Sequence, residues 1–149
     1  MNFEEKKPLT VFLVDDDEED QQLFSDALTG ISESVQLTIL NNGVELMERL
    51  FSGTPLPDMI FLDLYMPMMN GEECLQDIRE EKRFNTIPIL IYSNAFDLDM
   101  IEQLFEMGAN RYLQKPNSFS ELESSLEKII NSLVKNGIGG NTAYHITSN

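Results

Sequence analysis

Cysteine, histidine, tryptophan and positive charge are scarce in this sequence. It has one cysteine, Cys74, and one histidine among 149 residues, so it can form no intramolecular disulfide and offers no ligand cluster for zinc or an iron–sulfur centre. It has no tryptophan, and its 10 lysine and arginine residues face 26 aspartate and glutamate residues, which gives a formal net charge of -16. Repulsion at this charge argues against nucleic acid or an anionic membrane as a direct partner, and it favours cations and basic protein surfaces.

Long apolar runs are also absent. No apolar stretch approaches the length needed to span a bilayer, and the first residues lack the apolar core of a signal peptide. We therefore expect a cytoplasmic protein. The length fits one domain, which we place at 1–136, and the glycine-containing segment 137–149, with the lone His145, is expected to be a flexible C-terminal tail.

Short apolar runs alternate with segments of helical period along the chain. The apolar runs predict five strands, at 9–14, 35–40, 58–63, 87–93 and 110–114. The periodic segments predict five helices, at 17–29, 43–52, 71–81, 97–107 and 118–135. This alternation indicates an α/β fold with a doubly wound five-stranded parallel sheet of order 2-1-3-4-5 and helices on both faces.

Polar residues follow four of these strands at the point where each apolar run stops. Asp15 and Asp16 close the first strand and Asp63 closes the third, while Ser93 ends the fourth and Lys115 follows the fifth. Ligands of open parallel sheets sit outside the carboxyl ends of the strands, so these side chains should share one crevice. Adjacent carboxylates repel one another unless a cation is present, and Mg²⁺ prefers oxygen ligands. The combination suits one divalent cation and one phosphoryl group.

Asp63 is the candidate nucleophile of this site. A carboxylate can accept a phosphoryl group to form an aspartyl phosphate, and the transfer needs mainly positioning and charge neutralisation. A cation and Lys115 would neutralise charge, and Ser93 would donate a hydrogen bond to a phosphoryl oxygen. Taken alone, Lys115 would be a solvated lysine and Ser93 a turn residue, but their joint placement favours a site.

The acids that directly follow Asp15 and Asp16 have a simpler explanation. They fall in the first turn of a predicted helix, where negative charge is favoured by the helix dipole. We assign them to that role, with Asp17 as the N-cap; they are Asp17, Glu18, Glu19 and Asp20.

These motifs resemble the receiver domain of two-component response regulators, over Leu9 to about Asn136. The motifs that carry the resemblance are Val14-Asp15-Asp16, Asp63-Leu64-Tyr65-Met66-Pro67-Met68-Met69-Asn70-Gly71, Ser93, and Tyr112 ahead of Lys115-Pro116. The resemblance implies the flavodoxin-like, CheY-like (βα)5 fold. The acidic first loop and the methionine-rich stretch are also similar to those of stand-alone receivers partnered with phytochrome-type or hybrid histidine kinases.

By this resemblance, Asp63 is the phosphoacceptor. Asp16 and Asp63 correspond to direct ligands of Mg²⁺, for which Mn²⁺ can substitute, with the backbone carbonyl of Tyr65 as a third ligand. Asp15 corresponds to the acid that holds the metal through water.

The resemblance also implies a switch. Ser93 and Tyr112 correspond to the switching hydroxyl and aromatic residue, and Tyr112 is expected to move inward on phosphorylation. Lys115 corresponds to the lysine that contacts the phosphoryl group, and its bond to Pro116 is expected to be cis.

Two positions depart from the usual receiver pattern. Asn94 follows Ser93 where receivers normally carry a small residue, and Tyr65 sits two residues past the acceptor, where its side chain borders the phosphoryl group. We expect both to influence the access and the lifetime of the phosphoryl group.

The expected function is a phosphorylation-controlled signalling module rather than an enzyme, with slow metal-dependent autophosphorylation from small donors and slow autodephosphorylation. A histidine kinase or a phosphotransfer protein would supply the phosphoryl group, and a downstream protein of unknown identity would read it. A homodimer through the face at 97–135 is a further candidate interaction. Neither nucleic acid nor a membrane is expected as a partner.

Three other functions are alternatives to a phosphorylation-controlled signalling module. An aspartate-nucleophile phosphatase usually needs a second aspartate where this chain has Tyr65. A flavin-binding electron carrier needs a first loop that cradles phosphate, and the acidic loop here would repel one. A degenerate receiver that works unphosphorylated gains support from Asn94 but is disfavoured by the complete set of acids, hydroxyl and lysine.

Overall fold

The computed structural model describes residues 8–31 and 33–136. The predicted tail at 137–149, with His145, lies outside the described residues. Within the described part of the chain, no helix is both long enough and apolar enough to cross a membrane.

Five parallel strands form one sheet in the order β2-β1-β3-β4-β5, as predicted. Their bounds are β1 Leu9–Val14, β2 Val35–Leu40, β3 Met59–Leu62, β4 Ile89–Ser93 and β5 Arg111–Gln114. Val14 lies opposite both Leu40 of β2 and Leu62 of β3, so the carboxyl ends of the three strands are level. β4 begins at Ile89 rather than at 87 because Pro88 has no N–H to give to a strand ladder.

The five predicted helices are present and differ from their predicted bounds by at most two residues. They are α1 Glu18–Thr29, α2 Gly43–Leu50, α3 Gly71–Glu80, α4 Leu98–Glu106 and α5 Phe119–Asn136. Asp17 caps α1 by accepting hydrogen bonds from two backbone N–H groups, as predicted. A short 3₁₀ turn, η1 at Lys82–Phe84, was not predicted.

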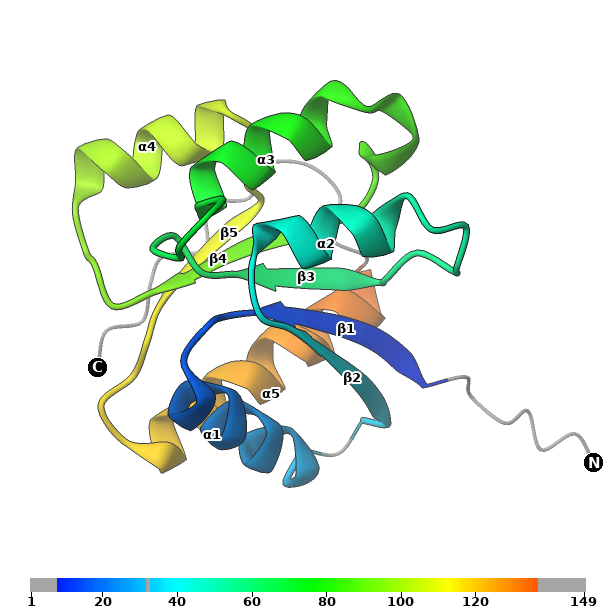
Figure 1. Cartoon of the computed structure of the whole chain (residues 1–149). Coiled ribbons are helices and arrows are strands. Elements are labelled where there is room, and N and C mark those ends of the chain that lie inside the picture. The colour runs from blue at the N-terminus through cyan, green and yellow to red at the C-terminus, as the bar shows by residue number, and fades with distance from the viewer. Residues whose placement is uncertain (1–7, 32, 137–149) are drawn as a thin grey trace, which may run out of the picture.

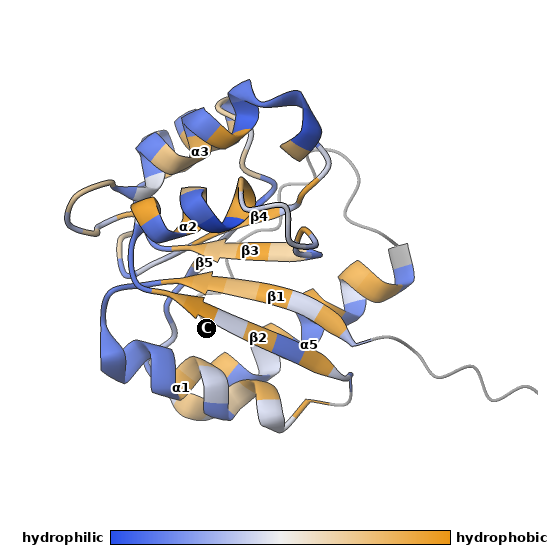
Figure 2. Cartoon of the chain, turned by 45° about the vertical axis from the view of Figure 1, so that its right-hand side comes forward, coloured by the Kyte–Doolittle hydropathy of each residue, from blue (hydrophilic) through white to orange (hydrophobic). Residues whose placement is uncertain are grey.

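The helices cover the two faces of the sheet unequally. Figure 1 shows α2, α3 and α4 on one face and α1 and α5 on the other. Figure 2 shows the strands as predominantly apolar and the helices as a mixture of polar and apolar residues. Strands buried on both faces in this way account for the uninterrupted apolar runs in the sequence.

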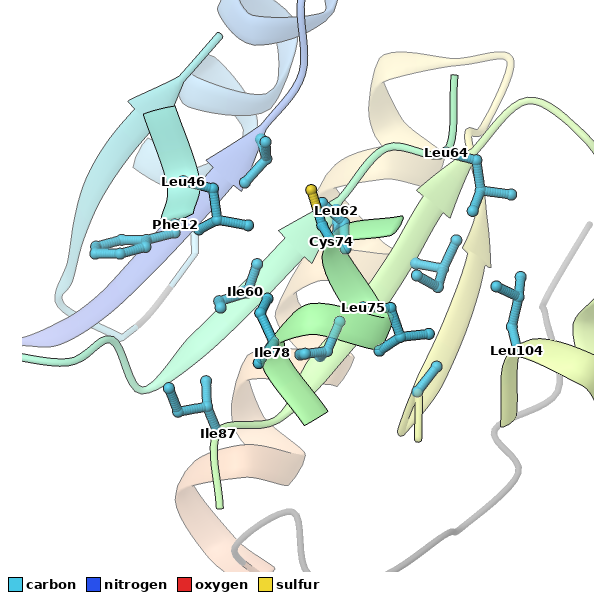
Figure 3. Close-up of a cluster of buried hydrophobic side chains, with 14 of the residues drawn as sticks. Phe12, Leu46, Ile60, Leu62, Leu64, Cys74, Leu75, Ile78, Ile87 and Leu104 are labelled. Atoms are coloured by element: carbon cyan, nitrogen blue, oxygen red, sulfur yellow. The ribbon is translucent and has the colours of Figure 1, made fainter. Parts of the chain in front are cut away.

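Cys74 is a residue of α3 and lies in the core among the apolar side chains shown in Figure 3. It is fully buried, and burial together with the nearby acids Asp77 and Glu73 raises the pKa of its thiol to about 12. A Cβ at Gly43 would lie only 2.4 Å from the Cys74 sulfur, so glycine is what allows α2 to start so close to α3.

Candidate functional site

The site is formed by loops that continue directly from the sheet ladder. The backbone N–H of Asp63 donates to the Val14 carbonyl at 3.0 Å, and the N–H of Lys115 donates to the Ser93 carbonyl at 2.8 Å. Asp15 likewise donates its N–H to the last residue of β2. Backbone hydrogen bonds to the strand ends therefore position Asp15, Asp63 and Lys115.

Three aspartates meet at this edge of the sheet, as the sequence predicts. Asp15, Asp16 and Asp63 each offer one carboxylate oxygen, and these oxygens lie within 4.8 Å of one another. Asp15 is fully buried and Asp63 is 6% exposed, while Asp16 faces solvent. A donor set made only of oxygens, with one side open to water, is suited to a divalent metal ion such as Mg²⁺ or Mn²⁺.

Burial makes the ionised form of these acids costly. It raises the pKa of Asp63 from 3.8 to about 6; Lys115 opposes this rise and Asp15 adds to it. Burial also raises the pKa of Asp15, which a backbone hydrogen bond from Asp17 and the Lys115 ammonium partly offset. A bound cation would relieve this penalty by supplying positive charge to both carboxylates.

The Lys115 ammonium lies among three carboxylates and its side chain is 8% exposed. Its Nζ is 2.9 Å from an Asp15 oxygen, 2.7 Å from an Asp20 oxygen and 3.6 Å from an Asp63 oxygen. Burial lowers the pKa of Lys115, but hydrogen bonds to Asp20 and Asp15 outweigh that effect, and the pKa is raised overall. The lysine therefore stays charged at any physiological pH.

Asp20 is a site residue that the sequence reasoning missed. It does lie in the first turn of α1, but its carboxylate reaches Lys115 and not only solvent. A signal was available: Asp20 stands four residues before Phe24, which is fully buried, and this spacing puts both on one face of the helix.

Residues 11–127 match the family described as the response regulator receiver domain. The chain belongs to that family. Receiver domains are phosphorylated by histidine kinases and are not classical enzymes, so the phosphatase and the electron carrier weighed above are not supported.

Individual receivers match over most of their length. Response regulator Rcp1 of Synechocystis is 27% identical over 134 residues, which are 87% of this chain and 91% of Rcp1. The structure of the phosphorylated cyanobacterial phytochrome response regulator RcpA aligns with a TM-score of 0.79 and 25% sequence identity. The alignment covers 87% of this chain and 96% of the RcpA chain. The Mn²⁺-bound form of Rcp1 gives a TM-score of 0.77 with the same identity and coverage.

In this receiver, Ser93 and Tyr112 meet at the loop that leads into α4. Ser93 is fully buried, and its Oγ accepts a hydrogen bond from the Ala95 N–H at 3.2 Å. Tyr112 is 2% exposed, and its hydroxyl donates to the Ala95 carbonyl. The inward position of Tyr112, which the resemblance assigned to the phosphorylated state, is thus the one this structure adopts.

The two residues that depart from the receiver pattern, Tyr65 and Asn94, are both exposed. Tyr65 is 65% exposed, and its hydroxyl lies 3.8 Å from the Met100 sulfur, so its ring leans toward α4. Asn94 is exposed, and its carbonyl accepts a hydrogen bond from Gln114 at 3.2 Å.

The expectation of a cis bond between Lys115 and Pro116 is wrong. The bond is trans, as is every peptide bond in the described residues. Trans is the form that bonds preceding proline favour, by about 0.5–1 kcal/mol. The Lys115 ammonium reaches the three acids from this backbone.

Gly71 holds the loop after Asp63 against the start of α3. A Cβ at Gly71 would lie 2.2 Å from the Asp63 carbonyl oxygen, so any other residue would displace the backbone of Asp63. The Gly71 N–H also donates to the Leu64 carbonyl at 3.0 Å, which closes the loop. The glycine of the receiver motif is therefore needed for close approach.

Proposed function

We propose that this receiver accepts a phosphoryl group on Asp63 from a histidine kinase or a phosphotransfer protein. We also propose that it signals through phosphorylation-dependent contacts with another protein. The observation that carries the proposal is the placement of Asp63. It is nearly buried, with two further aspartates on one side and the Lys115 ammonium 3.6 Å away on another.

The transfer would follow from that placement. A carboxylate oxygen of Asp63 attacks the phosphorus of a phosphohistidine, the P–N bond breaks, and its electron pair returns to the imidazole, which takes a proton from solvent. The Lys115 ammonium and the Ser93 hydroxyl then donate to phosphoryl oxygens. The product is an aspartyl phosphate, which water can later hydrolyse.

Asp16, Asp63 and the Tyr65 carbonyl would hold Mg²⁺ directly, with Asp15 acting through a water molecule. Mn²⁺ would fit the same oxygens. When bound, the cation neutralises charge on the phosphoryl oxygens. The Mn²⁺-bound form of the Rcp1 relative supports this choice of metal.

The partner is proposed from chemistry and from likeness. With a formal net charge of -16, the chain favours a kinase or phosphotransfer protein that presents a basic or apolar surface. Because a phytochrome response regulator is among the similar structures, a phytochrome-type kinase is the first donor to test. Receivers typically work in the cytoplasm, and we place this one there.

Labelling with acetyl phosphate tests the proposal. Intact-protein mass spectrometry should show one added phosphoryl group in the wild type with Mg²⁺ and none in Asp63→Asn. Asp58→Asn is the matched control: it removes the same charge at the other end of β3, where Asp58 accepts a hydrogen bond from the Thr10 N–H. Equal labelling of the wild type and Asp63→Asn would refute the assignment.

Metal titrations test the ligand roles. Asp16→Ala should lose more affinity for Mg²⁺ than Asp15→Ala, because a direct ligand contributes more than one that acts through water. An Asp16→Ala protein with unchanged affinity would contradict this arrangement.

A further inference from the structure

The lysine of the site is bound most closely to an acid that is not part of the metal cluster. The 2.7 Å separation between Lys115 Nζ and the Asp20 carboxylate is shorter than the separations to Asp15 and Asp63. The 3.6 Å separation to Asp63 is too long for a hydrogen bond. The ammonium is therefore drawn to the α1 side of the site, away from the phosphoacceptor.

The position of Asp20 is fixed by the start of α1. Its own N–H donates to the Asp17 cap at 3.2 Å. The next residue, Gln21, donates from its amide to the Asp15 carbonyl at 2.6 Å and to the Asn41 side chain at 2.9 Å. The first turn of the helix is thus tied to the ends of β1 and β2, and the Asp20 carboxylate cannot follow Lys115 far if the lysine turns away.

We propose that Asp20 is a positioning residue that competes with the phosphoryl group for Lys115. This inference rests on the proposed function of Asp63. Lysine has three N–H donors, and the structure directs two of them to Asp15 and Asp20. A phosphoryl oxygen on Asp63 would be the third acceptor, and the ammonium, now 3.6 Å from Asp63, gains a close bond to it by turning away from Asp20. That cost lowers the stability of the phosphorylated state.

Asp20 suits this role better than Asp15 does. Asp15 belongs to the metal-binding set, so its charge is shared with a cation whenever one is bound. Asp20 lies outside that set, and 26% of its side chain is exposed. It therefore remains a full counter-charge for Lys115 in the metal-loaded protein.

Affinity for beryllofluoride, an aspartyl-phosphate mimic, tests the proposal in calorimetric titrations at saturating Mg²⁺. Asp20→Asn should bind beryllofluoride about threefold to tenfold more tightly than the wild type, since a partly buried ion pair no longer opposes the contact. Its aspartyl phosphate should decay correspondingly more slowly. Glu19→Gln is the matched control, because it removes one charge from the same helical turn and Glu19 is exposed; it should leave both quantities within about twofold of the wild type.

A double-mutant cycle separates competition from a general effect of charge or folding. In a Lys115→Met background, Asp20→Asn should no longer tighten beryllofluoride binding. Unchanged or weaker binding by Asp20→Asn, or an equal gain in both backgrounds, would overturn the competing role. A wild type that neither binds beryllofluoride nor is labelled on Asp63 would instead refute the proposed function itself.

Discussion

Asp63 carries a buried charge that a receiver needs and that folding disfavours. Burial raises the pKa of Asp63 from 3.8 to about 6. Between these two values the folded protein keeps a proton that the unfolded chain has released. The contribution of Asp63 to stability is therefore full below about pH 4 and is lost as the pH rises through about 6.

The substitution Asp63→Asn removes the ionisable carboxyl group, and with it the loss of stability that occurs when Asp63 ionises in the folded protein. In the absence of divalent metal, we expect the variant to be more stable than the wild type near neutral pH by up to about 3 kcal/mol. The difference should shrink as the pH falls toward about 4. Urea unfolding across this range measures it, and a stability difference that does not change with pH would contradict the burial of an ionised Asp63.

Asn94 and Tyr65 allow a second test at the scale of single residues. Asn94 directly follows Ser93, and Tyr65 lies two residues past Asp63, where it lines a cavity of about 80 Å³ with Met100 and Met107. Asn94→Ala and Tyr65→Asn should each change the phosphoryl lifetime several-fold, a change of roughly 1 kcal/mol in the barrier. Decay curves identical to that of the wild type would show that these side chains do not control access.

At the scale of elements, hydrogen bonds hold the loop between β4 and α4 to β5. The carbonyl of Ala95 accepts from Tyr112, the carbonyl of Asn94 accepts from Gln114, and the N–H of Lys115 donates to Ser93. This loop joins the phosphoacceptor site to α4, so its order links the site to the surface of the molecule.

The Tyr112 hydroxyl is the contact in this loop that can be removed most cleanly. Tyr112→Phe should destabilise the protein by about 1 kcal/mol, because the partly buried Ala95 carbonyl loses its donor. It should also speed amide exchange at 95–100. Tyr65→Phe is the control, because it removes the hydroxyl of an exposed tyrosine that contacts the Met100 sulfur. This variant should leave amide exchange at 95–100 unchanged. Equal exchange rates in all three proteins would exclude a role for Tyr112 in ordering the loop.

The sequence predicts the elements and most of the site because both depend on local patterns. Asp15, Asp16 and Asp63 follow apolar runs, and parallel pairing alone brings them together. The pair of Asp20 and Lys115 could not be found in this way, because 95 residues separate them and the rotation of α1 decides which acid faces the sheet. The trans bond before Pro116 also has no local signal, since both isomers are compatible with a lysine–proline pair.

At the scale of the whole molecule, the proposed phosphorylation signal would have to leave through a surface. The segment 97–135 contains α4, β5 with Tyr112, and α5, and its exposed apolar side chains include Leu98, Phe119 and Val134. A surface of this kind suits a contact that forms or dissolves with the state of the site.

We therefore expect beryllofluoride to change the sedimenting mass of the protein through this face. A standard interface of about 1,600 Å² in total would be large enough for a switchable homodimer. Asp63→Asn, which cannot form the mimic complex, is the control. An unchanged mass together with no exchange protection across 97–135 would refute this output surface.

The buried thiol of Cys74 allows opening motions of α3 to be followed with a thiol reagent. Cys74 faces the sheet from α3, so a thiol reagent can modify it only after that helix has lifted from the core. With fast reclosure, the modification rate measures the fraction of molecules in which this part of the protein is open. Because Gly71, at the start of α3, rests on the backbone of Asp63, metal binding at the site should slow the modification of Cys74. One thiol in an otherwise cysteine-free chain then reports, without any added label, how firmly the occupied site holds its neighbouring helix.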